Sequence, residues 1–229
     1  MTVLVAPDKF KGTLDATQAA EAIASGWRQN RPDDSIDVFP ISDGGDGFGE
    51  LLGRYLEAET RLTSTVNAAH EPITAPWWWV SRQQLAIIES ARVIGLAQLP
   101  PGRFHPFELD TRGLAQVLQD ASQLDPRLCL VGIGGSATND AGFGMALGLG
   151  WRFFDRRGRP IKLWTDLYRL VKIERPGKRL QPKKVIVAVD VQNPLLGSHG
   201  ATRIYGPQKG IRPEDIRPTE RNLRRLVRV

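Results

Sequence analysis

The strongest constraint on the fold is an alternation of short apolar runs with polar loops and amphipathic stretches near the N-terminus. Residues 3–7 and 36–41 each predict a short strand. Residues 16–27 between them place apolar side chains at helical spacing, and Asp15 stands three residues before a glutamine, as in a capping box. A second helix is expected over residues 48–56. Strands and helices alternating in this way indicate βαβ units and a parallel sheet.

The middle of the chain has a different pattern. Apolar runs separated by turn-forming residues predict strands over residues 62–66, 77–80 and 85–88. They favour a mixed or antiparallel sheet and a second domain that begins near residue 60. Further along, we expect a helix, a buried strand, a helix and a last strand over residues 114–121, 128–133, 144–149 and 185–189. The three consecutive tryptophans, Trp77 to Trp79, are interpreted as strand and core residues.

A glycine-rich loop follows the strand expected at residues 128–133. Seven glycines fall between residues 132 and 150, and such a backbone can turn its N–H groups toward an anion. The loop lacks the Gly-Lys-Ser/Thr ending of a Walker A motif. Its alternative role is a tight turn in which Asn139 and Asp140 only cap the next helix. The candidate anion-binding residues are Gly134, Gly135, Ser136, Ala137, Thr138, Asn139 and Asp140.

A second loop, Asp43-Gly44-Gly45-Asp46-Gly47, follows the strand expected at residues 36–41. One of its carboxylates could bind Mg²⁺ while the backbone N–H groups contact a phosphate. The same acids could instead stabilise the start of a helix, which is worth about 0.3–1 kcal/mol. The sequence leaves both roles open.

Two further loops follow predicted strands, where α/β proteins place their ligand sites. Lys9 and Lys11 follow the first strand and could neutralise a phosphate or carboxylate, although exposed lysines are more often only solvated. Asp190 ends the strand at residues 185–189 and could serve as a general base, as a metal ligand, or only as a turn former. Asn193 and Lys209 lie in the segments that follow.

Composition excludes several classes of protein. The 229 residues are 41% hydrophobic and 24% charged, which fits neither a disordered chain nor a membrane protein, and a cytoplasmic location is expected. The only cysteine, Cys129, excludes an internal disulfide and is expected to be an inert core residue. The net charge of +6 divides into −7 for residues 1–151 and +13 for residues 152–229. This polarity suggests a nucleic-acid surface or a piece whose complement lies elsewhere.

Several blocks together resemble the type I glycerate kinase family. They occur in family order at residues 5–13, 42–47, 132–140, 190–197 and 206–210. The resemblance implies an α/β fold of two domains, an incomplete Rossmann- or flavodoxin-like domain and an inserted mixed α/β domain. Residues 1–60 would form the N-terminal part of the discontinuous first domain, and residues 61–229 the inserted domain with a truncated C-terminal end.

The resemblance also implies an activity, namely phosphoryl transfer from ATP to a hydroxyl of D-glycerate with Mg²⁺ as cofactor. On that basis Asp190 is the expected general base or metal ligand, and Lys11 acts with Lys9 on anionic groups. Asp43 and Asp46 would position the metal or substrate hydroxyls, with Asp43 and Asp190 as the expected metal ligands. Gly44, Gly45, Asn193, Lys209 and the loop from residue 134 to 140 would contact substrate or phosphate. Glycerate and ATP are the expected partners, with no nucleic acid and no membrane.

The chain departs from the family pattern in two places. Residues 109–113 keep only the second glycine of a Tyr/Phe-Gly-x-Gly element, and the family's sequence beyond residues 206–210 is replaced by an arginine-rich end. The chain is therefore expected to be C-terminally truncated. One alternative is a catalytically inactive remnant that folds only in its inserted domain. A nucleic-acid binder is the weakest alternative, because no helix-turn-helix, zinc-finger or RNP-type motif is present.

Overall fold

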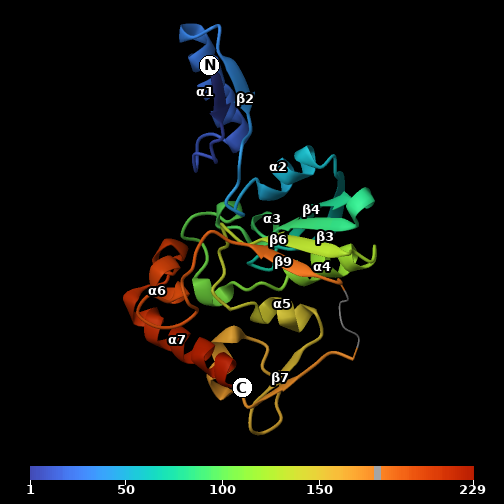
Figure 1. The fold of residues 1–229 in the computed structure, drawn as a ribbon. Coiled ribbons are helices and arrows are strands. Elements are labelled where there is room, and N and C mark those ends of the chain that lie inside the picture. Colours follow the sequence, from blue (N-terminus) through green and yellow to red (C-terminus); the bar gives the residue numbers. More distant parts are fainter. Residues whose placement is uncertain (178–181) are drawn as a thin grey trace.

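The computed structural model describes residues 1–177 and 182–229, shown as a ribbon in Figure 1. The N-terminal unit consists of β1 (Thr2–Val5), α1 (Ala16–Asn30) and β2 (Ser35–Val38). Its two strands are parallel and pair Thr2 with Ser35, so the predicted βαβ arrangement is confirmed. Asp15 accepts a hydrogen bond from the backbone N–H of Gln18, whose side chain accepts one from the N–H of Asp15, and this capping box starts α1 as predicted.

A five-stranded sheet forms the centre of the body. In spatial order its strands are β3 (Glu59–Val66), β4 (Pro72–Val80), β5 (Leu85–Glu89), β6 (Leu128–Gly132) and β9 (Val185–Ala188). Strand β4 is antiparallel to both of its neighbours, β3 and β5, whereas β5, β6 and β9 run parallel to one another. The predicted mixed sheet is confirmed. Because the last three strands are parallel, their carboxyl ends lie at one edge, and the loops that follow them meet there.

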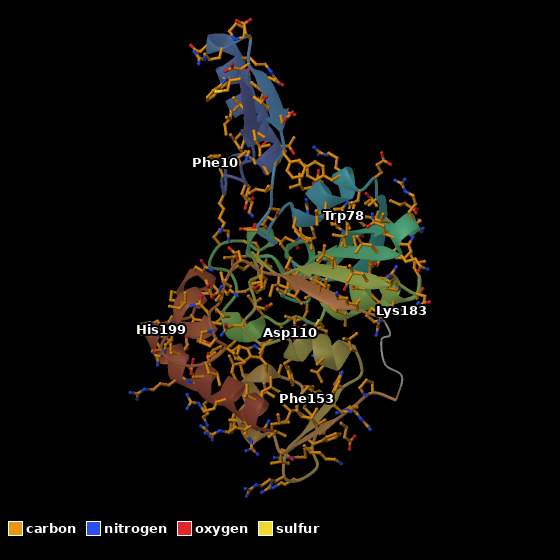
Figure 2. The ribbon with its side chains drawn as sticks, viewed as in Figure 1. Phe10, Trp78, Asp110, Phe153, Lys183 and His199 are labelled. Carbon is orange, nitrogen blue, oxygen red and sulfur yellow. The ribbon has the colours of Figure 1, made fainter. Side chains whose placement is uncertain are left out.

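Successive side chains of β4 point to opposite faces of this sheet and contribute to the hydrophobic core on each face. Trp77 and Trp79 pack on the face covered by α4 (Leu114–Ser122), whereas Trp78 packs on the face covered by α2 (Phe48–Tyr55). A Cβ atom on Gly49 of α2 would lie 2.0 Å from the Trp78 ring, so α2 can approach the ring this closely only with glycine. Helix α2 thus belongs to the packing of the body, beside Trp78 in Figure 2. The domain division at residue 60 remains a prediction.

The rest of the chain forms smaller elements around the sheet. They include a two-stranded antiparallel sheet of β7 (Arg152–Phe154) and β8 (Lys172–Glu174). The remaining α-helices are α3 (Ala91–Ile94), α5 (Phe143–Gly148), α6 (Ala201–Tyr205) and α7 (Pro213–Arg228). The 3-10 helices are η1 (Ser81–Gln83), η2 (Leu96–Gln98), η3 (Pro106–Glu108), η4 (Trp164–Arg169) and η5 (Pro207–Lys209). No helix of the described residues is both long and apolar enough to cross a membrane.

The arginine-rich C-terminal segment folds as α7, which packs against η4. Leu223 is buried in the contact, and the Asn222 side chain accepts a hydrogen bond of 2.7 Å from the backbone N–H of Tyr168. The arginines of residues 213–228 therefore belong to a helix that packs on the rest of the chain.

The N-terminal unit exposes an apolar face. The unit projects away from the body in Figure 1. Leu4 on β1 is 66% exposed, and Phe39, 54% exposed, and Ile41 lie just after β2 and are also exposed. Edge strand β9 similarly exposes Val185 and Val187. Exposed apolar side chains on neighbouring strands favour association with another surface.

We expect Leu4→Lys to reduce the binding of a hydrophobic dye such as anilinonaphthalene sulfonate to the folded chain. The side chain is exposed, so a charge there removes apolar surface at little cost in folding free energy. Leu62→Lys is the matched control, because Leu62 is 68% exposed on β3 and lies outside the N-terminal unit. Equal dye fluorescence for Leu4→Lys and wild type would contradict the assignment of the dye-binding apolar surface to this unit.

Candidate functional site

A cavity of about 1300 Å³, the cleft, lies where all four predicted loops meet. Its walls come from the loop after β1, the segment before α2, the ends of β5, β6 and β9, and the region of α6 and η5. Ten predicted site residues line it: Lys9, Lys11, Asp43, Asp46, Gly134, Gly135, Ser136, Asp190, Asn193 and Lys209. Six others are not among its lining residues: Gly44, Gly45, Ala137, Thr138, Asn139 and Asp140.

The loops approach one another at backbone distance. The N–H of Gly134 donates to the carbonyl of Gly44 at 3.1 Å. A Cβ on Gly134 would lie 2.6 Å from Cα of Gly45, and one on Gly44 would lie 2.7 Å from the carbonyl oxygen of Ala188. Both contacts are with backbone, which cannot move aside, so these glycines are required for the loops to converge.

Lys9 forms the central ion pair of the cleft. Its Nζ lies 2.7 Å from Oδ1 of Asp43, which also accepts the N–H of Gly45 at 2.8 Å. Partial burial alone would lower the pKa of Lys9, but the hydrogen bond to Asp43 and the neighbouring carboxylates raise it above its usual value. For Asp43 burial acts to raise the pKa, but the bonds from Lys9 and Gly45 hold it below the usual value. Both groups are therefore charged at neutral pH.

Glu89 lines the cleft and was missed by the sequence reasoning. It ends β5, is 1% exposed, and accepts hydrogen bonds from the N–H groups of Gly47 at 3.0 Å and Gly49 at 2.9 Å. Burial raises its pKa, although the two backbone bonds and Arg92 oppose the rise. Glu89 thus fixes the N-terminus of α2 and the loop before it. An acid at the end of an otherwise apolar strand was the available signal.

Lys209 ties η5 to the glycine-rich loop after β6. Its Nζ donates to Oγ of Ser136 at 3.0 Å and to the carbonyl of Thr138 at 2.7 Å. Burial lowers its pKa to about 8, and the charge of Asp140 only partly opposes this. A lysine in this state places a positive charge at the cleft wall near neutral pH and loses it above pH 8.

Asp140 performs the capping role that the sequence left open. Its buried carboxylate accepts the N–H and hydroxyl of Thr111 at 3.0 and 2.8 Å and the N–H of Gly144 at 2.8 Å. Burial raises its pKa despite these bonds. Asn139 donates to the Thr202 hydroxyl of α6 at 3.1 Å. These two side chains hold the glycine-rich loop against its neighbours from behind.

Asp190 is exposed and lines the cleft just beyond β9, and its carboxylate is engaged by no hydrogen bond or ion pair within residues 1–177 and 182–229. Asn193 lies close by in sequence, donates to the carbonyl of His199 at 3.0 Å and accepts from the Tyr205 hydroxyl. Lys11, on the opposite loop, is exposed. The cleft therefore presents a carboxylate and a cation that are open to a ligand.

The cleft suits a magnesium ion that is held largely by a phosphate ligand. In the described part of the chain, no three His, Cys, Asp or Glu side chains gather as a metal site of their own. Asp43, Asp46 and Asp190 nonetheless place oxygen donors on one cavity. Mg²⁺ commonly binds through one or two carboxylates together with substrate phosphates and water, and this donor set fits that pattern.

The fold and the cleft define an α/β protein with a lysine-lined cavity at the carboxyl ends of parallel strands. The glycerate kinase family model matches residues 3–229, and the chain belongs to this family. Glycerate kinase of Halalkalibacterium halodurans is 36% identical over 225 residues, covering 97% of this chain and 59% of that protein. Glycerate 2-kinase of Escherichia coli K12 is 34% identical over 232 residues, covering 100% and 61%.

A solved structure agrees with these relatives. A crystal structure from Salmonella typhimurium LT2, assigned to glycerate kinase 2, superposes with a TM-score of 0.82 at 33% identity. The match covers 100% of this chain and 63% of that one. The chain thus spans about three fifths of the length of these relatives, and the fold expected from the family resemblance is confirmed.

We expect Glu89→Ala to lower the free energy of unfolding by about 1–3 kcal/mol, because it leaves the N–H groups of Gly47 and Gly49 without their acceptor. Urea unfolding followed by circular dichroism measures the change. Glu50→Ala is the control: Glu50 pairs with Arg54 and Arg92 at the surface, where such pairs are worth about 0–1 kcal/mol. Equal losses for the two variants would refute the structural role of Glu89.

Proposed function

We propose that this chain transfers a phosphoryl group from ATP to a hydroxyl of D-glycerate, giving phosphoglycerate and ADP. The observation that carries the proposal is the convergence of Lys9, Lys11 and Asp190 with the glycine-rich loop on one cleft. Phosphoryl transfer depends mainly on positioning and charge neutralisation, and such a cleft supplies both. The names of the relatives support glycerate as the acceptor.

Asp190 is the proposed general base. The residue lines the cleft and its carboxylate has no partner among the described residues, so it is available to accept the proton of the attacking hydroxyl. Lys11 is proposed to bind the anionic groups of the substrates directly. Lys9 acts beside it, but its pairing with Asp43 fixes its orientation and offsets part of its charge.

The wall formed by Gly134, Gly135 and Ser136 is proposed to bind a phosphate or carboxylate, with Lys209 holding Ser136 in place. Asp43 is the proposed ligand of Mg²⁺, which when bound with ATP would neutralise charge on the phosphates, and Asp190 would ligate the metal only as the alternative to its role as base. Only one oxygen of Asp43 is bound by Lys9 and Gly45, so this arrangement is compatible with a metal contact.

A second candidate is a catalytically inactive member of the family. The observation that favours it is the projection of the N-terminal unit, which carries Lys9 and Lys11, with an exposed apolar face. Phe10, beside these lysines, is 55% exposed and is labelled at the base of the unit in Figure 2. A unit held by few contacts would position its lysines too loosely for turnover.

Asp190→Asn tests the first candidate. We expect wild type to release ADP in the presence of D-glycerate and the variant to lose at least 100-fold in kcat, because the amide cannot accept the proton. Asp33→Asn, on the exposed loop before β2, is the matched control. Wild-type turnover in Asp190→Asn would refute the assigned role. Wild-type ADP release no faster than that of Asp190→Asn would favour the inactive alternative.

The lowered pKa of Lys209 predicts that anion binding in the cleft depends on pH. Because burial lowers its pKa to about 8, the side chain is charged below pH 8 and neutral above it. The affinity for D-glycerate or for ATP, measured by calorimetry, should therefore fall severalfold between pH 7 and pH 9. Lys209→Arg should remove this fall, since guanidinium stays charged, and Lys209→Gln should bind weakly at both pH values. Identical profiles for all three proteins would contradict the prediction.

A further inference from the structure

A second cavity is formed by residues from the last third of the sequence. Its volume is about 550 Å³, and it is formed by the turn after β7, the end of η4 and α7, close to the C-terminus in Figure 1. Phe153 of β7, labelled in Figure 2, precedes the turn that contributes Asp155 to Arg159. The lining residues are Asp155, Arg156, Arg157, Arg159, Tyr168, Arg169, Val171 and Arg225. None of them lines the cleft.

The arginines of this cavity outnumber its acids. Asp155, the only carboxylate in the lining, accepts the N–H groups of Arg157 at 2.8 Å and Arg159 at 3.0 Å and pairs with the Arg159 guanidinium at 2.8 Å. The Asp155 carboxylate thus already has its partners within the turn after β7. Arg169 pairs with Asp166 at 2.6 Å. Within the described residues, Arg156, Arg157 and Arg225 have no carboxylate within 4.0 Å, so the cavity carries an unbalanced positive charge.

Part of this arginine cluster is held in place before any ligand arrives. Nε of Arg225 donates to the carbonyl of Leu170, and Nε of Arg169 is buried without a hydrogen-bond partner. The guanidinium of Arg221 lies over the Tyr168 ring, 4.7 Å from its centroid. Side chains that are already ordered lose less conformational freedom on binding, which favours recognition of a ligand.

We propose that this cavity is a second binding site, specific for the phosphate chain of a small polyphosphorylated anion. Guanidinium groups bind phosphate through paired N–H donors, and three unbalanced arginines match a ligand with several negative charges. The volume is in the range of small-molecule sites. Two guanidiniums already lie over Tyr168, so the ring is occupied by cations, which favours a site for phosphates over one for a nucleobase.

Inorganic tripolyphosphate is the probe, titrated calorimetrically into the full chain at low salt. We expect Arg156→Ser/Arg157→Ser to weaken binding at this site at least tenfold, because both side chains are exposed and unpaired in the described structure. Arg28→Ser/Arg127→Ser is the matched control: it removes the same charge from exposed positions that line neither cavity. Lys9→Met tests the cleft separately and should retain the site.

Two results of the tripolyphosphate titrations would overturn the proposal. One is tripolyphosphate binding that disappears in Lys9→Met and persists in Arg156→Ser/Arg157→Ser, which would place all of it in the cleft. The other is an equal loss in the two double-arginine variants, which would make the effect one of net charge alone. ATP forms a further arm: binding to this site by ATP with none by tripolyphosphate would also refute recognition of the phosphate chain itself. Kinase turnover is not a readout here, so failure of the proposed function is recognised independently.

Discussion

The site depends on the contact of three loops at backbone distance. Gly44 lies against the end of β9, and Gly134 lies against Gly45, at separations that leave no room for a Cβ atom. The ends of β6 and β9 lie together because β5, β6 and β9 are parallel and end at one edge of the sheet, and the segment between β2 and α2 packs against both of them. The glycines therefore have a packing role that is independent of any ligand. An anion would bind beside this junction, on the surface that Gly135 and Ser136 present to the cleft.

The carboxylates around this junction fall into two groups by environment. Glu89 and Asp140 are each 1% exposed and are surrounded by N–H donors, which makes them structural ties for α2 and α5. Asp46 and Asp190 lie on the cleft wall. A buried carboxylate bound by several backbone donors cannot leave them without exposing unsatisfied groups, whereas a cleft carboxylate is free to bind substrate or metal. Burial therefore separates the structural acids from the chemical ones.

Much of this could be predicted from the sequence, because strands and helices follow apolar periodicity. The β1–β2 pair, the capping box at Asp15 and the core position of Trp78 were all predicted, and the four loops after strands do meet. The role of Glu89 was not, because its donors lie some 40 residues earlier and only the fold brings them to it. Nor could spacing reveal that α2 packs on the central sheet while β1 and β2 form a separate unit.

The cleft and the second cavity differ in the kind of positive side chain that each exposes. In the cleft the arginines Arg54 and Arg92 are paired with glutamates, so the charge open to a ligand comes from lysines. The second cavity uses arginine alone. Lysine loses its charge when burial lowers its pKa, as at Lys209, whereas guanidinium stays protonated throughout the physiological range. Anion binding in the cleft should therefore depend on pH near 8, and binding in the arginine cavity should not.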